Sequence, residues 1–256
     1  MTDPGVVVTG LKFSYGTGVE VLRGVDFAAP RGQVTALVGP NGSGKSTLLK
    51  TISGYLKPKE GSVTVCGEDP FALPPEARSA LIAYCGDEPE PAFDFTVEET
   101  VQLGRVSRKT GDVSAGSERA MTEVGVLDLR RRPITALSSG ERQRAYLARA
   151  LCQDPEVFLL DEPTSHLDMA YELQIMEIVA RLARQKLKTV VSVHHDLNLA
   201  LRYASTLFFL KDGVIRRQLE PWRVTAEVIA DVYGVKAAVL RHPSLGCPVV
   251  VPESPL

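Results

Sequence analysis

The sequence predicts an α/β protein with a mostly parallel central sheet, an antiparallel β-subdomain at the N-terminus and a helical sub-lobe. Three apolar runs, "VFLLD", "TVVSV" and "TLFFL", have the composition of buried strands, and a helical pattern separates the first two. Buried strands that alternate with amphipathic helices are typical of a parallel sheet covered on both faces. The predicted helix begins near residue 167, and its apolar face contains Leu167, Tyr171, Ile175, Ile178 and Leu182.

The remaining elements follow from local patterns along the chain. The runs "VVVTGLKFSY" and "VLRGVDFAA" are broken by glycine and proline, which predicts antiparallel strands at the N-terminal edge. "VTALVG" then predicts a strand, and "KSTLLKTISG" a helix ending at Gly54. The polar stretch 106–119 predicts a mobile loop between two helices of the sub-lobe. We expect a single domain, 1–256, with its core at about 1–87 and 151–256, including a C-terminal extension, and the sub-lobe at about 88–150.

Composition excludes several classes of protein. With 29 basic and 31 acidic residues the net charge is −2, so no strong overall field attracts nucleic acid or anionic lipid. The four cysteines show neither a paired framework nor a metal-ligand spacing, which suits a reducing cytosol. The N-terminus lacks the pattern of a signal peptide, and the apolar runs are shorter than the roughly 20 residues that cross a bilayer. We therefore expect a cytoplasmic protein whose role at a membrane is peripheral.

The segment "GPNGSGKST" carries the clearest chemical signal. It matches the P-loop pattern G-x-x-x-x-G-K-[ST] between a predicted strand and a predicted helix. Glycines let backbone amides turn toward phosphate oxygens, Lys45 reaches the β- and γ-phosphates, and the Ser46 hydroxyl can ligate Mg²⁺. The pattern alone leaves ATP and GTP open. The candidate nucleotide-binding residues here are Gly39, Pro40, Asn41, Gly42, Ser43, Gly44, Lys45, Ser46 and Thr47.

"VFLLDEP" places two acids at the end of a predicted buried strand. Asp161 would lie beside the phosphate loop as a second ligand on the magnesium side, and Glu162 is a candidate to polarise the attacking water. The alternative is that both acids merely end a strand. The P-loop earlier in the chain favours the catalytic interpretation.

Between these motifs lies "LSSGERQRAYLARAL", which alone could be an N-cap followed by a solvated helix face. It resembles the signature motif of the ATP-binding-cassette family, which reads L-S-G-G-Q or L-S-G-G-E before a basic helix. The resemblance implies an active site shared by two copies, in which the signature residues contact ATP held by the partner copy. Ser139 stands where the family more often has glycine. The residues implied are Ser138, Ser139, Gly140 and Glu141.

Other segments resemble elements of the same family and assign further roles. Tyr15 in "FSYG" would stack on adenine, which favours ATP, although a core tyrosine is the alternative. Asp168 in "SHLD" resembles the loop that links the two sites of the dimer, and His195 resembles the switch histidine that contacts the γ-phosphate. His194 has no such match and is expected to pack in a strand or to face solvent.

One position departs from the family pattern. Asp87 stands where the family has a glutamine that touches magnesium and relays the nucleotide state to the membrane partner. A shorter, charged side chain could bind the ion directly or through water. The alternative is a plain acidic loop residue. The expected metal ligands are therefore Ser46, Asp161 and Asp87, with ATP and Mg²⁺ as cofactors.

The last 50 or so residues resemble the C-terminal extension of ATPase subunits from bacterial importers of iron-siderophore, haem and cobalamin complexes, on "VYGV" and "HPSLGCPVVVP". This implies a homodimer of ATPase subunits that powers uptake of a metal chelate. It would work at the inner face of the cell membrane, with separate transmembrane permease subunits and, indirectly, an external substrate-binding protein, and without nucleic acid. The alternatives are a soluble non-transport ABC ATPase that acts as a mechanical switch, for example in iron-sulfur assembly, and an importer of another small solute.

Overall fold

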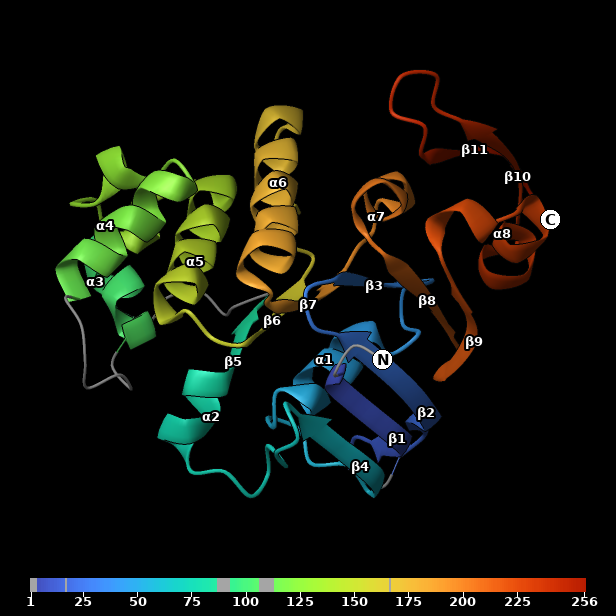
Figure 1. Ribbon diagram of the computed structural model, residues 1–256, viewed down its shortest axis with the longest axis horizontal. Coiled ribbons are helices and arrows are strands. Elements are labelled where there is room, and N and C mark those ends of the chain that lie inside the picture. The colour runs from blue at the N-terminus through green and yellow to red at the C-terminus, as the bar shows by residue number, and fades with distance from the viewer. Residues whose placement is uncertain (1–3, 17, 87–92, 106–112, 166) are drawn as a thin grey trace.

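A computed structural model describes residues 4–16, 18–86, 93–105, 113–165 and 167–256 of the chain. The described part contains a central six-stranded sheet, an antiparallel three-stranded sheet and a two-stranded hairpin (Figure 1). The predicted α/β class is therefore confirmed. In the described residues no helix is both long and apolar enough to cross a membrane.

The central sheet has the strand order β5-β6-β7-β3-β8-β9. All neighbours pair in parallel except β8 and β9, which are antiparallel. Every residue of β3, β6 and β7 is buried, as expected for strands with helices or another sheet on both faces. The strands are β5 (Ile82–Cys85), β6 (Val157–Asp161), β7 (Thr189–Val193), β3 (Val34–Val38), β8 (Thr206–Lys211) and β9 (Val214–Leu219).

The N-terminal segment forms the predicted antiparallel sheet, in the order β2-β1-β4. Its strands are β1 (Pro4–Ser14), β2 (Glu20–Pro30) and β4 (Glu60–Val65). Val6, Val8 and Phe27 pack together with α1 (Lys45–Ile52) and with Leu159 and Val191 of the central sheet. This subdomain therefore covers one face of the central sheet.

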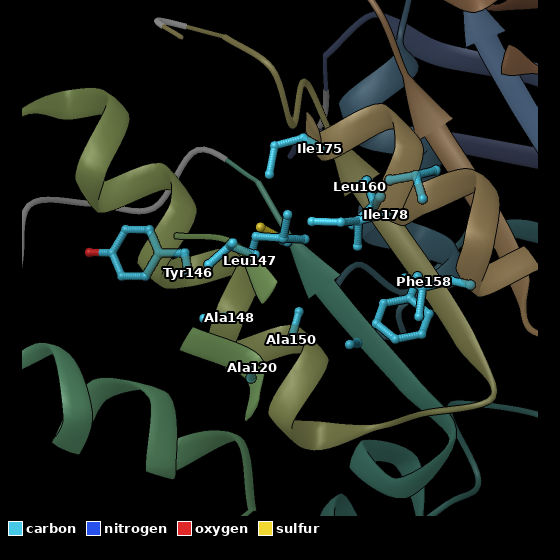
Figure 2. Packing of buried hydrophobic residues seen from close by; sticks show 14 of the residues in the cluster. Ala120, Tyr146, Leu147, Ala148, Ala150, Phe158, Leu160, Ile175 and Ile178 are labelled. Atoms are coloured by element: carbon cyan, nitrogen blue, oxygen red, sulfur yellow. The ribbon is translucent and has the colours of Figure 1, made fainter. Parts of the chain in front are cut away.

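Helices cover the opposite face of the central sheet. They pack on the strand side chains that alternate with those facing the antiparallel sheet. Phe158 and Leu160 of β6 point to this side, whereas Leu159 points to the other, as the two-residue period of a strand requires. Figure 2 shows Phe158 and Leu160 beside Ile175 and Ile178. The helices of this region are α3 (Val97–Gln102), α4 (Val113–Glu123), α5 (Ser139–Gln153) and α6 (Met169–Lys186), with the 3₁₀ turns Leu103–Arg105, Leu127–Leu129 and Ile134–Ala136.

One expectation for this helical region needs correction. The loop predicted over 106–119 is wrong from residue 113 onward, because α4 begins there; residues 106–112 lie outside the described ranges. Burial of Ser117, Ala120 and Met121 stabilises this helix despite its glycine- and serine-rich sequence. Helix α5 continues to Gln153, close to the sub-lobe boundary expected at about 150. The division into core and sub-lobe remains a prediction.

The predicted helix after residue 167 is confirmed with a slightly later start. Asp168 is the N-cap of α6, and its carboxylate accepts a hydrogen bond from the backbone N–H of Tyr171 at 3.1 Å. Ile175, Ile178 and Leu182 are buried as the periodicity predicted.

The C-terminal part of the chain packs beside β8 and β9 (Figure 1). It contributes to a third buried cluster with Ala36 and Val38 of β3 and Phe209 of β8. Helix α2 (Pro75–Leu81) lies before β5, at the other edge of the sheet. The remaining elements are α7 (Leu197–Tyr203), the 3₁₀ turn Pro221–Arg223, α8 (Ala226–Tyr233), β10 (Val235–Arg241) and β11 (Pro248–Pro255).

Candidate nucleotide-binding site

The P-loop connects β3 to α1 with a backbone that only glycine accommodates at its key positions. Gly39, Gly42 and Gly44 have φ values of 150°, 75° and 105°. A Cβ atom on Gly39 would lie 1.9 Å from the carbonyl oxygen of Leu210. Gly44 is the N-cap of α1 and has no side chain to bond the first N–H groups of the helix. Those N–H groups and the positive end of the helix dipole suit an anionic phosphate.

Lys45 lies folded over this loop. It is 6% exposed, and its Nζ donates hydrogen bonds to the carbonyl oxygens of Gly39 and Pro40, each at 2.9 Å. Burial lowers the pKa of Lys45, and the nearby carboxylates of Glu162 and Asp161 oppose that effect. The ammonium group thus occupies the mouth of the loop, bonded to neutral carbonyls that a phosphate could replace.

The pair Ser46 and Asp161 lies where the sequence predicts magnesium ligands. The Ser46 hydroxyl donates to Asp161 Oδ1 at 3.1 Å, although the two residues are 115 positions apart. Asp161 is 6% exposed, and its strand β6 lies between β5 and β7. A hydroxyl and a carboxylate in contact form a donor set of hard oxygens, which fits Mg²⁺. The described residues contain no group of three or more His, Cys, Asp or Glu that could hold a metal.

Tyr84 of β5 also bonds this carboxylate, and sequence reasoning missed it. Its hydroxyl donates to Asp161 Oδ2 at 3.0 Å, which fixes the second oxygen of the carboxylate. The signal in the sequence was weak, because Tyr84 looks like any strand residue in "IAYC". Only the pairing of β5 with β6 brings it to Asp161.

The side chains of Glu162 and His195 are in contact at the same edge of the sheet. His195 Nε2 lies 2.8 Å from Glu162 Oε1. Glu162 has φ 53°, a left-handed conformation that is unusual for a residue other than glycine, and its N–H donates to the carbonyl of Val193 at 3.2 Å. Strained backbone of this kind persists where the surrounding structure enforces it, and it is common at active sites. The two predicted catalytic side chains are thus brought together.

Tyr15 lies beside the helix that follows the P-loop. Its hydroxyl shares a hydrogen bond with Thr47 Oγ1 at 3.2 Å, and its ring meets Phe13 edge-on with centroids 4.9 Å apart. The residue is 54% exposed, so the alternative of a core tyrosine is wrong. An exposed ring anchored at its hydroxyl can present a face to a base.

The signature residues begin α5 and are bonded to one another. The Ser138 side chain accepts from the N–H of Glu141 at 3.3 Å, and Glu141 accepts from the N–H and hydroxyl of Ser138 at 2.8 and 2.9 Å. These bonds, first from the backbone of Ser138, lower the pKa of Glu141. Ser138 and Ser139 are exposed. Ser138 therefore does act as an N-cap, as the alternative supposed. The cap leaves the first turn of α5 exposed and accessible to a partner.

Arg144 ties the signature helix to the start of α6. It is buried, its Nη1 donates to the carbonyl of Gly125 at 3.0 Å, and its guanidinium lies 3.6 Å from the centroid of the Tyr171 ring. Tyr171 is itself bonded to the cap residue Asp168. Arg144 and Tyr171 thereby connect the signature helix α5 to Asp168 at the start of α6.

The two remaining candidate residues have different outcomes. His194 follows β7 directly and is 3% exposed, so the solvent-facing alternative is wrong; burial lowers its pKa to about 4. Asp87 lies outside the described residues, and its metal-side role stays a prediction. Gly86, the last described residue before it, lies against Asp161, where an added Cβ would be 2.9 Å from the Asp161 Cβ.

Known proteins resemble this chain over most of its length. FepC of Escherichia coli, a ferric enterobactin transport ATP-binding protein, is 35% identical, and the match covers 98% of this chain and 96% of FepC. BtuD of Halobacterium salinarum, a cobalamin import ATP-binding protein, is 38% identical over 96% of this chain. A dimeric ATP-binding cassette, MJ0796, solved in a post-hydrolysis state with ADP and Pi, has a TM-score of 0.78 at 27% identity, covering 84% of this chain and 98% of that one.

These matches differ in how much of the relative they span. The chain spans 63% of BtuD and 56% of YvrA, an ABC transporter ATP-binding protein of Bacillus subtilis that is 38% identical. The family described as ABC transporter matches residues 22–165, which include the P-loop, the signature and the acids after β6. The chain therefore belongs to the ABC transporter family and contains its ATP-binding cassette.

Proposed function

We propose that this chain is the ATP-hydrolysing subunit of an importer that takes up a metal chelate of the iron-siderophore, haem or cobalamin type. The observation that carries the catalytic part is the meeting of one local contact and two sequence-distant pairs at one end of the strands. The local contact is Lys45 with the P-loop carbonyls, and the pairs are Ser46 with Asp161 and Glu162 with His195. The kind of cargo is supported by relatives named for ferric enterobactin, hemin and cobalamin.

The proposed chemistry uses these residues in separate roles. The P-loop amides and Lys45 would bind the phosphates, with Lys45 leaving the carbonyls of Gly39 and Pro40. Ser46 and Asp161 would hold Mg²⁺, which supplies positive charge for the phosphate oxygens. Glu162 would accept a proton from the attacking water, and His195, 2.8 Å away, would orient that carboxylate or contact the γ-phosphate.

The exposed start of α5 supports action as a homodimer. Ser138 and Glu141 form hydrogen bonds with each other. The family resemblance implies that the signature residues contact ATP only when a second copy of the chain faces them. Closure of two copies around two nucleotides would couple ATP binding to a change in the position of the lobes.

An apolar hollow on the helical lobe supports docking of a membrane permease. Side chains of α3 and α4 line a space of about 400 Å³, and Phe95, Leu103 and Val113 there are 44%, 47% and 37% exposed. Phe93 nearby is 70% exposed. Exposed apolar residues gathered in one place mark interaction surfaces. The proposed permease would bring the chain to the inner face of the membrane, and an external binding protein would deliver the chelate.

The proposal is tested by reconstituting the chain with its co-encoded membrane protein in vesicles. We expect ATP hydrolysis to rise when the binding protein and its chelate are present, and to be lost with Lys45→Ala. Transport of radiolabelled ferric siderophore, haem and cobalamin then assigns the cargo. Hydrolysis that neither a permease nor any solute influences would instead support the non-transport switch, and stimulation by another small solute would change the cargo.

A further inference from the structure

The C-terminal extension, here residues 224–256, contacts elements of the nucleotide site at two separate places. It contains α8, β10 and β11, and in Figure 1 it lies beside α7 and β8. β11 contacts α7, and α8 contacts β8. Family resemblance gives this segment no chemical role, and a simple cap on the sheet edge would not need the first contact described below.

The first contact joins β11 to the helix that follows His195. Asn198 in the first turn of α7 accepts a hydrogen bond from the Val250 N–H at 2.8 Å and donates one to the Val250 carbonyl at 3.2 Å. One side-chain amide thus satisfies both backbone groups of a buried strand residue, as a neighbouring strand would. Such a pair fixes α7 against β11 in position and in rotation.

The two hydrogen bonds between Asn198 and Val250, called the clasp below, lie close in sequence to His195 of the proposed catalytic pair. Asp196 caps α7 by accepting from the N–H of Asn198 at 2.7 Å. The residue before Asp196 is His195, whose Nε2 lies 2.8 Å from Glu162. The segment 195–198 therefore contacts Glu162 through His195 and Val250 through Asn198. A shift of β11 would for this reason move His195.

The second contact places α8 on the central sheet. Tyr233 of α8 packs on the cluster that contains Val38 of β3 and Phe209 of β8. Val38 is the residue before Gly39, the first glycine of the P-loop. This packing seats the extension next to the strand that leads into the loop.

We propose that the C-terminal extension is a positioning element of the nucleotide site, in which Val250 sets the position of the His195 segment through Asn198. The inference rests on ATP binding and hydrolysis by the proposed function. Loss of the Asn198 contact slows hydrolysis at saturating ATP and changes ATP affinity less, because the contact supports the histidine beside Glu162 and not the phosphate loop.

The Asn198 contact is tested with a matched pair of amide variants. Asn198→Leu removes the clasp, and Gln174→Leu removes another amide that bonds a backbone carbonyl, that of Glu123 at 3.2 Å. We expect Asn198→Leu to lower kcat about fivefold to tenfold with a smaller change in ATP affinity, and Gln174→Leu to leave kcat nearly unchanged.

The outcomes separate the inference from the function on which it rests. If the parent chain binds ATP and the Asn198 variant matches its control in Kd and kcat, the extension is only a cap and the inference is wrong. The inference is also wrong if the control loses function in proportion to its melting temperature. If the parent chain binds no ATP at all, the proposed function itself is wrong, and the inference falls with it.

Discussion

Two regions of the predicted site differ in how far the chain's own contacts order them. One is the end of the central strands, where the P-loop lies, and the other is the first turn of α5, where the signature lies. At the sheet edge Lys45 and Asp161 are each 6% exposed and bond groups from other strands and loops. At the start of α5, Ser138 is exposed, and its side chain and N–H bond Glu141, one turn along. The fold therefore orders the first region through distant contacts, whereas the second is an ordinary, exposed helix start.

The hydrogen bonding at the start of the signature helix also occurs at another helix of this chain. Thr96 and Glu99 at the start of α3 form the same reciprocal capping box as Ser138 and Glu141. Local hydrogen bonding is thus the same at both helices, and any difference in function must come from what each helix faces. The two boxes serve as each other's control.

The largest expected effect tests the sheet edge. Glu162→Gln should lower ATP hydrolysis about 10²- to 10⁴-fold, because an amide cannot accept the proton from water, while ATP binding is retained. Glu118→Gln on the exposed face of α4 is the control and should hydrolyse at the parent rate. Phosphate release under single-turnover conditions measures both. A Glu162→Gln chain as active as the parent would remove Glu162 from catalysis.

The signature helix gives the next largest effect. Ser138→Ala and Thr96→Ala should each lower the unfolding free energy by about 1 kcal/mol, because each removes an N-cap. Only Ser138→Ala should also lower ATP hydrolysis, by about hundredfold, through loss of a donor to the transferring phosphate. Equal activity of the two variants in a steady-state assay at saturating ATP would place the signature outside the reaction.

A smaller effect tests whether the sheet edge is closed to water. The pKa of His194 is lowered to about 4 by burial, so the unfolded chain binds a proton more readily between pH 6.5 and 4. The unfolding free energy should therefore fall as the pH falls, by about 2 kcal/mol between pH 6.5 and pH 5. Urea unfolding at both pH values should show this loss reduced in His194→Leu and retained in the surface control His242→Gln.

The smallest effect concerns the base rather than the phosphates. Tyr15→Ala should weaken ATP binding about tenfold, the worth of one stacked aromatic ring, and should narrow any preference for ATP over GTP. Tyr55→Ala, whose ring is 79% exposed, is the control. Titration with both nucleotides checks the result, and unchanged affinity for both would return Tyr15 to a packing role beside Phe13.

Sequence reasoning went furthest where chemistry is encoded in a short segment. The P-loop, Asp161, Glu162 and the face of α6 needed only residue types at fixed spacings, because a strand, a glycine turn and a helix start are local structures. It failed at α4, where a helix rich in serine and glycine is stabilised by burial of Met121 and Ala120 rather than by propensity. Tyr84 was missed for a related reason, since its role depends on a neighbouring strand.

The sequence by itself therefore determined the class of the protein, the phosphate loop and the identity of the acids, because each depends on residues close together in the chain. Only the tertiary structure decided which side chains meet. The Ser46–Asp161 bond, the Glu162–His195 pair and the Asn198–Val250 clasp join residues 33 to 115 positions apart. Such contacts follow from the order of strands in the sheet, which no local pattern contains.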